Sequence, residues 1–414
     1  MSPASPAFAR QPLKPLDDAL AELLAHAAPL SKFESVSTFD ADGRVLAQHV
    51  VAELDVPAHD NSAMDGYAVR SADWLTADTV LQVNQRIAAG SSGTALAAMS
   101  AARIFTGAPI PAGADAVVMQ EECTAPAPDA VCMATQPKAG QWVRQRGEDV
   151  TAGRVVLFKG ELLAPQSIGL AASIGYAKLS VAAPVRVALF STGDELVMPG
   201  DVAPADMTPG AIYNSNRFFL RALLVRLGCA VTDMGIVPDK LDATKAALLS
   251  ASAAHDLVLT SGGVSVGEED HIKPAVQALG QLNLWQIAIK PGKPFAYGKI
   301  DQAHFMGLPG NPVSSFVTFL LLVRPFIRKL QGALHFAPES IACYAHFDWP
   351  RADKRREFLR VRRNSAGGLD LFDNQSSGVL TSVVWADGLV DNPAGNTIAH
   401  GDSVRFISLS SLMC

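Results

Sequence analysis

The sequence predicts an α/β protein of several domains: a central α/β domain with a mostly parallel sheet, a β-rich inserted domain, a helical linker domain and a C-terminal β domain. Three observations predict it. The chain has 414 residues, too many for one average core, so roughly two to four domains are expected. Strand and helix patterns alternate from 184 to 333, which is typical of a parallel sheet covered by helices on both faces. Short β-type runs separated by glycine and proline fill 54–149 and 334–414.

The segment before the β-rich part predicts a helix. Leu16, Leu20, Leu23 and Leu24 fall on one helical face. Residues 151–183 have a similar helical texture, as in APQSIGLAASIGYA (164–177), and we expect them to pack beside this helix, which makes the β-rich part between them an insertion. The predicted division is 1–13 as a flexible tail, 14–53 with 150–183 as the helical linker domain, 54–149 as the inserted β-rich domain, 184–333 as the α/β domain and 334–414 as the C-terminal β domain.

The α/β segment alternates strands and helices in a regular order. Residues 185–193 predict a strand, and a helix follows that Ser215 caps and Gly228 ends. The following elements are a strand at 230–237, a helix at 243–254 and a strand at 256–260. In a sheet of this kind, ligands bind beyond the C-terminal ends of the strands.

Composition excludes several functions. The formal net charge is −6, so no general positive field attracts nucleic acid. The five cysteines contain no C-x-x-C pair, which predicts free thiols in a reducing compartment. The first residues lack the apolar core of a signal peptide, and the apolar run 313–323 is too short to span a membrane. No H-E-x-x-H or G-x-S-x-G motif occurs, so zinc and serine hydrolysis are set aside. We expect a cytoplasmic protein.

The stretch 260–273, TSGGVSVGEEDHIK, follows a predicted strand and precedes a helix. Its glycines allow backbone N–H groups to approach an oxyanion. It matches neither G-x-G-x-x-G nor a Walker loop. Asp270 lies where a divalent cation can bridge a carboxylate and a phosphate. A tight turn with acidic capping of the helix explains the stretch equally well.

Further motifs fall at the same predicted edge of the sheet. STGDEL (191–196) ends the first strand, and GLPGNPVSS (307–315) is an elbow from a strand into a helix, with Asn311 as cap and Pro312 at the first helical position. Helix capping is the alternative for both. In 288–298, AIKPGKPFAYG, a stiff Pro-Gly turn can aim two lysines at an oxyanion, although a solvated hairpin turn is also possible.

A dense polar cluster lies in the β-rich part. Asp60, Asn61, Ser62 and Asp65 fall within DVPAHDNSAMDGYAV (55–69), between apolar ends. Such clusters in Pro- and Gly-bracketed segments often carry function. An elaborate turn is the alternative.

Taken together, these segments resemble one family. DNSAMDGYAV, TGAPIPAGADAVV, RGEDV, STGDEL, SGGVSVGEEDHIK, KPGKPFAYG and GLPGNPVSS occur in the order found in MoeA, the molybdopterin molybdenumtransferase family, which includes the gephyrin E domain and the plant Cnx E domain. The resemblance runs from about residue 14 to the C-terminus. It implies a central domain of the molybdopterin-binding type.

The resemblance also implies a reaction. An adenylylated molybdopterin is the substrate, molybdate is inserted at its dithiolene, and AMP is released in a reaction that depends on a divalent cation, usually Mg²⁺. It implies a homodimer of elongated subunits with a shared cleft. Transient contact with the pterin adenylyltransferase and with molybdoenzymes is expected, and no nucleic acid or membrane partner.

Functional residues carry over by position in this sequence. The expected catalytic residues are Asp60, Thr106, Asp149, Glu195, Asp239, Asp270 and Lys290. The expected substrate- and phosphate-binding residues are Thr192, Gly193, Ser261, Gly262, Gly263, Ser265, Gly267, Pro309, Gly310, Asn311 and Pro312. The expected molybdate ligands are Lys290, Lys293, Arg355 and Ser377, and the expected metal ligands are Glu195 and Asp270.

The sequence departs from the family's pattern in two places. Gln286 stands where some relatives carry a lysine, and Ser377 rather than Ser376 is only a preference in a variant glycine-serine segment. Two other functions stay open: a scaffold built on the same fold, and a pterin adenylyltransferase that shares the α/β domain. The preference for molybdate or tungstate is open as well.

Overall fold

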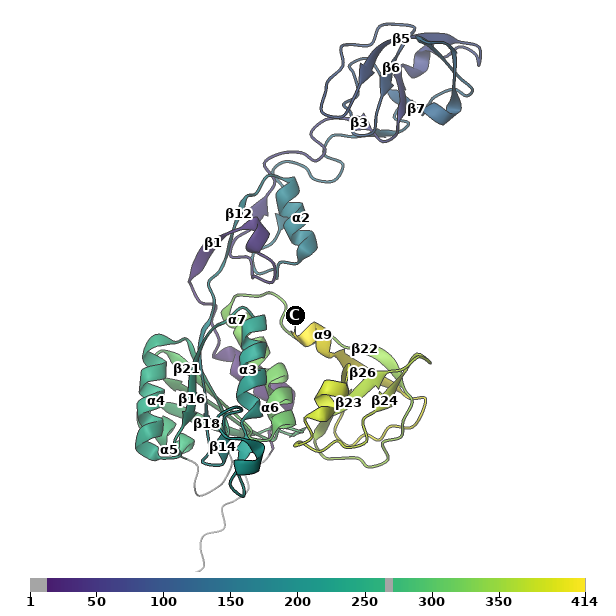
Figure 1. The fold of residues 1–414 in the computed structure, drawn as a ribbon. Coiled ribbons are helices and arrows are strands. Elements are labelled where there is room, and N and C mark those ends of the chain that lie inside the picture. Colours follow the sequence, from purple (N-terminus) through teal and green to yellow (C-terminus); the bar gives the residue numbers. More distant parts are fainter. Residues whose placement is uncertain (1–12, 265–270, 414) are drawn as a thin grey trace, which may run out of the picture.

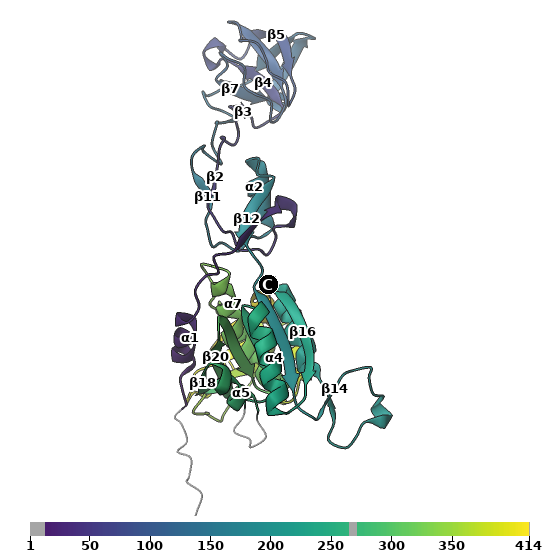
Figure 2. The same ribbon diagram turned by 90° about the vertical axis from the view of Figure 1, so that its left-hand side faces the viewer.

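The computed structural model describes residues 13–264 and 271–413. Figures 1 and 2 show an elongated chain, with a β-rich part at one end, a small middle part, and the α/β and C-terminal parts side by side at the other end. Among the described residues, no helix is long and apolar enough to cross a membrane.

The β-rich part folds around a six-stranded sheet. The strand order is β7-β4-β6-β5-β9-β8, and only β5 and β6 pair in parallel. Apolar side chains form a core on each side of this sheet. The strands are β3 (Asn61–Ser62), β4 (Gly66–Val69), β5 (Val80–Ile87), β6 (Ser100–Ile104), β7 (Ala116–Met119), β8 (Cys123–Ala127), β9 (Ala130–Met133) and β10 (Val143–Arg144).

The middle part joins segments from both sides of the β-rich part. Strand β1 (Phe33–Ser37) pairs with β12 (Lys178–Ala182), and β2 (Val50–Val51) pairs with β11 (Val155–Leu157). Helix α2 (Pro165–Ser173) packs on these strands through Ala171. Because both pairings are between a strand before and a strand after the β-rich part, that part is inserted, as predicted.

The N-terminal helix packs elsewhere than expected. Helix α1 (Leu16–Ala25) buries Leu16, Ala19 and Leu23 in the core of the α/β part. The prediction that it packs beside 151–183 is therefore wrong. Its apolar face shows that the helix needs a partner, but helical periodicity carries no information about which partner.

The α/β part has helices on both faces of a six-stranded sheet, as predicted. The strand order is β16-β13-β17-β21-β20-β18, and the first four strands are mutually parallel. Its strands are β13 (Arg186–Thr192), β16 (Ala230–Val237), β17 (Leu257–Ser261), β18 (Gln281–Gln286), β20 (Pro294–Ile300) and β21 (Ala303–Leu308), with a separate pair β14 (Leu196–Val197) and β15 (Ile212–Tyr213).

Successive side chains of strand β13 point to opposite faces of the sheet, where they enter two separate cores. Val187 and Leu189 face α1, α3 (Ser215–Arg226) and the helices that follow β21, whereas Ala188 and Phe190 face α4 (Leu241–Ala254) and α5 (Ile272–Leu279). Asn214, not Ser215, is the N-cap of α3, since its side chain accepts a hydrogen bond from the N–H of Arg217.

The helix that contains the apolar run 313–323 continues through Pro325. Helix α6 (Pro312–Thr318) passes through a π-helical turn, η5 (Phe319–Val323), into α7 (Arg324–Leu330). Proline lacks an N–H and its ring clashes with the carbonyl four residues earlier in an α-helix. The wider π turn, in which the N–H of Arg324 bonds to the carbonyl of Phe319, lets the helix continue past Pro325.

The C-terminal part is a closed barrel. Strands β23, β24, β22, β26 and β25 pair in that order, and β25 pairs back to β23. Strand β19 (Ile289–Lys290), which leaves the α/β part, pairs in parallel with β23. The elements are β22 (Ile341–Ala345), β23 (Arg356–Arg363), β24 (Gly368–Leu371), α8 (Thr381–Trp385), β25 (Gly388–Asn392), β26 (Ser403–Ser408) and α9 (Leu409–Met413).

Candidate functional site

The C-terminal ends of the parallel strands lie at one edge of the α/β sheet. Thr192 is paired with Val237, and Ser261 is paired with Leu308, so β16, β13, β17 and β21 end in register. The loops after these strands contain the motifs that the sequence placed at a ligand-binding edge. The sheet therefore brings the STGDEL, SGG and LPGNP segments together, as expected from the order of strands.

The glycines of the second loop permit a close approach of backbones. Gly262 and Gly263 both have positive φ, at 95° and 67°. A Cβ added at Gly262 would lie 3.0 Å from the carbonyl oxygen of Thr192, and one at Gly263 would lie 3.0 Å from the Thr192 hydroxyl. Because a side chain at either position would meet the neighbouring loop, glycine keeps these two loops in contact. Ser265, Gly267 and Asp270 lie outside the described residues.

One asparagine joins two of these loops. The side-chain amide of Asn216 donates to the hydroxyl of Ser261 and to the carbonyl of Gly310, both at 2.7 Å. Asn216 and Ser261 are both buried. Sequence reasoning did not select Asn216, because nothing in the first turn of α3 indicates which loops it reaches.

Carboxylates gather where the first loop leaves the sheet. The carboxylate of Glu195 folds back over Gly193, whose added Cβ would lie 2.6 Å from it. Asp194 accepts a hydrogen bond from the backbone N–H of Asp239 at 3.3 Å. Mg²⁺ takes oxygen ligands and is often bound by one or two carboxylates together with substrate phosphates, so the Glu195 donor fits such an ion. The described residues contain no group of three or more His, Cys, Asp or Glu that could hold a metal by itself.

The elbow after β21 has the predicted form. Asn311 is the N-cap of α6 and Pro312 occupies the first turn. The next N–H, that of Val313, donates to the carbonyl of Ser377 at 3.0 Å. The start of α6 thus holds the segment of the C-terminal part that contains the predicted molybdate ligand Ser377.

The same helix holds the lysine turn. A Cβ added at Gly292, whose φ is 114°, would lie 2.4 Å from the hydroxyl of Thr318 and 3.5 Å from the carbonyl of Ser314. The turn between Lys290 and Lys293 therefore lies directly against α6. Lys293 is exposed at this turn. A freely solvated hairpin turn, the alternative interpretation, does not describe this packed geometry.

Lys290 lies among charged groups of the C-terminal barrel. In the β19–β23 pairing, Lys290 is the register partner of Glu357, and its ammonium lies 3.0 Å from one Glu357 oxygen. The ammonium also lies 3.5 Å from Asp353, which forms a two-pronged ion pair with Arg355. The Arg355 guanidinium holds the pKa of the Asp353 carboxyl well below its ordinary value, and Asp353 raises the pKa of Arg355. Lys290 and Arg355 thus both contact the carboxylate of Asp353.

Glu357 is held rigidly beneath Lys290. Its side chain is 1% exposed, and its second oxygen accepts from the indole N–H of Trp349 at 2.7 Å and from Asn392 at 3.3 Å. The Lys290 ammonium also lies 5.7 Å from the centre of a Trp349 ring. Sequence reasoning missed Asp353, Glu357, Trp349 and Asn392, because only the pairing of β19 with the barrel reveals their proximity.

Three predicted residues lie in segments that hydrogen bonds join within the β-rich part. The carboxylate of Asp60 accepts from the N–H of Arg146 at 2.8 Å, and the N–H of Asp149 bonds to the carbonyl of Val56. The backbone N–H and hydroxyl of Thr106 donate to Asp65 at 2.8 and 2.9 Å. These two hydrogen bonds hold the pKa of Asp65 below its ordinary value. The segments around Asp60, Thr106 and Asp149 are thus joined.

A single chain does not bring this cluster to the sheet edge. Figure 1 shows the β-rich part and the α/β part at opposite ends of the chain, with the middle part between them. Asp60, Thr106 and Asp149 therefore lie apart from Glu195, Asp239 and Lys290 of the same chain.

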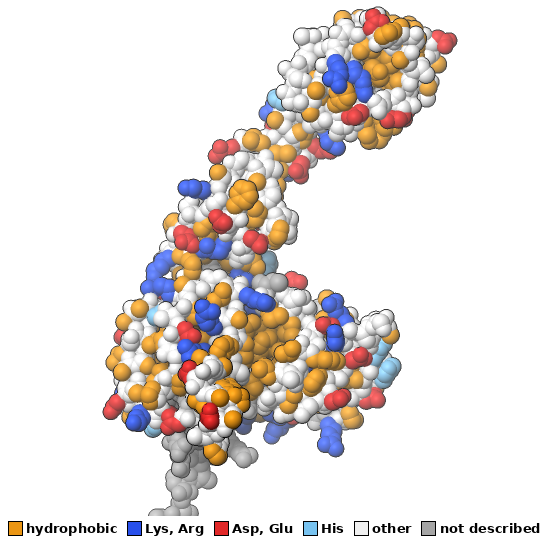
Figure 3. Space-filling model, in the orientation of Figure 1, with side chains coloured by type: hydrophobic (Ala, Val, Ile, Leu, Met, Phe, Trp, Pro, Cys, Tyr) orange, Lys and Arg blue, Asp and Glu red, His pale blue; other side chains and the backbone are white. Residues whose placement is uncertain are grey.

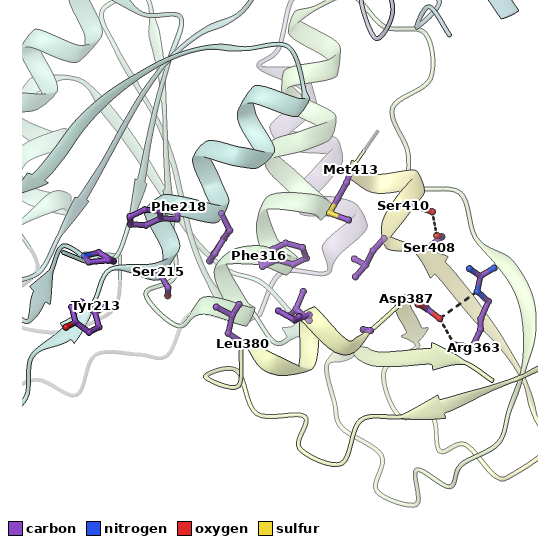
Figure 4. A pocket seen from close by; sticks show the side chains of 16 residues that line it. Tyr213, Ser215, Phe218, Phe316, Arg363, Leu380, Asp387, Ser408, Ser410 and Met413 are labelled. Carbon is purple, nitrogen blue, oxygen red and sulfur yellow. Dashed lines mark hydrogen bonds and ion pairs between the residues drawn. The ribbon is translucent and has the colours of Figure 1, made fainter. Parts of the chain in front are cut away.

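An apolar cavity of about 760 Å³ lies between α3 and α6 of the α/β part and α8 and α9 of the barrel. Figure 4 shows Phe218, Phe316, Leu380 and Met413 around it, with the Asp387–Arg363 pair at its polar side. Figure 3 shows hydrophobic side chains gathered over this region. Phe218 is 52% exposed and Val384 is 83% exposed, so the apolar surface extends out of the cavity.

Comparisons with known proteins agree with this architecture. Residues 14–175 match a model of the MoeA N-terminal region (domain I and II), 188–329 match a "probable molybdopterin binding domain", and 343–409 match the MoeA C-terminal region (domain IV). A molybdopterin molybdenumtransferase of Haemophilus influenzae is 42% identical over 83% of this chain and 85% of its own length. Molybdopterin molybdenumtransferase 2 of Mycobacterium tuberculosis is 36% identical over 90% and 93%. A crystal structure of the molybdopterin biosynthesis MoeA protein of Pyrococcus horikoshii OT3 covers 96% of this chain and 100% of its own, with 29% identity and a TM-score of 0.83.

Proposed function

Since this chain belongs to the molybdopterin molybdenumtransferase family, we propose that it inserts molybdenum into molybdopterin in molybdenum cofactor biosynthesis. Its substrates are molybdate and adenylylated molybdopterin, and its second product is AMP. The observation that carries the proposal is that the sheet-edge loops lead into α6, against which the turn between Lys290 and Lys293 packs. Loops from β13, β17 and β21 contact one another, and the start of α6 holds both the Gly310 elbow and the Ser377 segment.

The sheet-edge loops would bind the phosphates of the pterin substrate. Gly262 and Gly263 leave room for backbone N–H groups to approach an oxyanion, and Gly310 precedes a helix N-terminus. Asn216 holds the Ser261 and Gly310 loops at a fixed separation. Fixed donors of this kind stabilise charge that develops on a leaving phosphate without reorganising during the reaction.

The cations around Arg355 would bind molybdate. Molybdate is a tetrahedral dianion, which charged donors and hydroxyl groups hold best. Lys290 and Arg355 supply two positive charges that already meet at a single carboxylate. The Gly292 turn, next to Lys293, and the Ser377 backbone both contact α6. We propose these four residues as the molybdate ligands.

Mg²⁺ is the proposed cofactor, with Glu195 and Asp270 as its protein ligands. When bound, the ion would neutralise phosphate charge and so ease departure of AMP. Glu195 supplies a hard oxygen donor beside the Gly193 backbone, and Asp239 is held next to this loop through Asp194. Asp270 follows the glycine loop in sequence, outside the described residues.

A homodimer would complete the site. Asp60, Thr106 and Asp149 lie far from the sheet edge of their own chain (Figure 1), so we propose that they face the sheet edge of a second copy. The exposed apolar side chains Phe218 and Val384, beside the cavity of Figure 4, support an interface. Contacts with the pterin adenylyltransferase and with molybdoenzymes, and a cytoplasmic location, remain predictions.

A single-turnover assay tests the proposal. The full chain would be mixed with adenylylated molybdopterin and Mg²⁺, with and without molybdate, and AMP release followed. We expect AMP to appear only when molybdate is present. AMP release by this chain without molybdate would contradict coupled insertion. No AMP in either case, from folded protein, would favour a scaffold, and turnover of ATP with unadenylylated pterin would favour an adenylyltransferase.

A further inference from the structure

The two cations of the proposed molybdate site share one carboxylate. One oxygen of Asp353 lies 2.8 Å from the Arg355 guanidinium and 3.5 Å from the Lys290 ammonium. The other oxygen accepts from the backbone N–H and from Nε of Arg355, both at 3.0 Å. One carboxylate therefore contacts both cations. It pairs with the Arg355 guanidinium through two oxygens, as a tetrahedral oxyanion also can.

Glu357, the second carboxylate, differs from Asp353 in burial and in partners. The Glu357 side chain is 1% exposed, whereas that of Asp353 is 20% exposed. Glu357 accepts hydrogen bonds from the neutral donors of Trp349 and Asn392, which would lose their partner if it moved. The hydrogen bonds and ion pairs of the Asp353 carboxylate in the described structure come from Lys290 and Arg355.

The backbone of Asp353 is fixed independently of its side chain. Its carbonyl accepts a hydrogen bond from the N–H of Gly395 at 2.7 Å. The side chain can therefore rotate out of the site while the loop stays in place. If it does so, the cations lose one of the two carboxylates that balance their charge, and the site gains affinity for an anion.

We propose that the Asp353 carboxylate occupies the position of the oxyanion substrate between Lys290 and Arg355, and that molybdate binds by displacing it. This inference rests on the proposed function, which assigns molybdate to these two cations. Glu357 keeps Lys290 in place throughout. A tetrahedral dianion gains more Coulomb energy from the two cations than a monoanion does, so it competes better with the carboxylate that Arg355 binds through two oxygens. Asp353 is thus a specificity-determining residue, which keeps abundant monoanions out.

Calorimetric titration of the full-length chain with molybdate tests this, in a buffer free of phosphate and sulfate. The variant D353A should lower the Kd for molybdate by about tenfold, the effect of losing one charge-assisted competitor. The control is E357Q, which removes one negative charge beside Lys290 without vacating the oxyanion position. We expect E357Q to tighten binding much less than D353A, or to weaken it.

The outcomes separate the two proposals. If D353A and E357Q tighten molybdate binding equally, the loss of one negative charge explains the effect, and the displacement is overturned. If D353A binds molybdate more weakly, Asp353 only orients Arg355, and the displacement is overturned. The molybdate site would still stand in that case if K290A abolishes binding. If K290A binds molybdate like the wild type, or no variant binds it, the molybdate assignment and the displacement both fail.

A crystal structure of the wild-type chain soaked in molybdate provides a test that does not depend on the folding of E357Q. We expect molybdate oxygens on Arg355 and Lys290, with the Asp353 side chain turned away. Molybdate bound elsewhere, with Asp353 still paired to Arg355, would overturn the proposal.

Discussion

The side-chain amide of Asn216 lies 2.7 Å from both the Ser261 hydroxyl and the Gly310 carbonyl, two groups that are 49 positions apart in the sequence. Asn216 is in the first turn of α3. The start of α3 and two loops of the sheet edge are thus fixed to one another through a single side chain.

Removing that amide should affect both stability and substrate binding. The variant N216A leaves the buried Ser261 hydroxyl without its donor, at a cost of about 1–3 kcal/mol. The matched control is N214A, which removes the N-cap of the same helix and costs about 1 kcal/mol. Thermal unfolding should show losses in both variants. Only N216A should raise the KM for the pterin substrate, and a similar rise in N214A would mean that general loosening of α3 is responsible.

Substituting Gly262 separates conformational strain from steric contact. G262A places a Cβ 3.0 Å from the Thr192 carbonyl at a φ of 95°. G235A has a similar φ of 87° but meets no atom within 4 Å. Both should lose about 1–2 kcal/mol for the left-handed backbone. G262A should in addition lower affinity for the pterin substrate, measured by calorimetry. Unchanged affinity in G262A would remove this loop from the phosphate site.

Arg360 supports the Ser377 segment from below. It is 1% exposed, and its guanidinium donates to the Ser382 hydroxyl and to the carbonyls of Phe358 and Ser376. Burial lowers its pKa to about 10. We expect R360M to raise the KM for molybdate by about tenfold, because the segment loses its hydrogen bonds, with a smaller change in kcat.

The control for that variant is R362M on the same strand, where Arg362 is exposed and stacks on Trp385. It should leave both kinetic constants near those of the wild type. If R360M lowers kcat and leaves the KM for molybdate unchanged, Arg360 does not act through the Ser377 segment.

His304 should make the α/β part sensitive to mild acid. Burial lowers its pKa from 6.5 to about 4, and its Nδ1 lies 3.0 Å from the Tyr297 hydroxyl. Between these two pH values the unfolded chain binds a proton that the folded chain does not, so stability falls as the pH falls through this window. Thermal unfolding measured from pH 6.5 down to about 5 should show a steeper loss in the wild type than in H304Q. The exposed His335 offers the control H335Q, which should behave as the wild type.

Mixed dimers test the proposed shared cleft. D60N alters the β-rich part and K290A alters the α/β part, and each should be inactive alone. Co-expressed and co-purified, about half of the dimers would be mixed, and one of the two clefts in each would be intact, so AMP release should recover to about a quarter of the wild-type rate. No recovery, with mixed dimers demonstrated by mass, would place the whole site within one chain.

The sequence could predict the sheet edge but not the charged groups around Lys290. Thr192, Ser261 and Gly310 follow strands whose periodicity is readable, and parallel strands that end together bring their loops together. Asp353 and Glu357 are more than 60 residues beyond Lys290 in the sequence and meet it only because β19 joins the barrel. Helix α1 was assigned to the wrong partner for the same reason, since an apolar face is compatible with several surfaces.

The sequence by itself determined the α/β alternation and the inserted β-rich part, because local periodicity and turn chemistry act over a few residues. The residues proposed for phosphate and molybdate follow from the resemblance to the family. Tertiary structure alone decided that α6 holds both the Gly310 elbow and the Ser377 segment, that Asp353 lies between Lys290 and Arg355, and that Asp60 lies away from the sheet edge of its own chain. Those relationships depend on pairings between distant segments, which the free energy of the whole fold selects and no local pattern encodes.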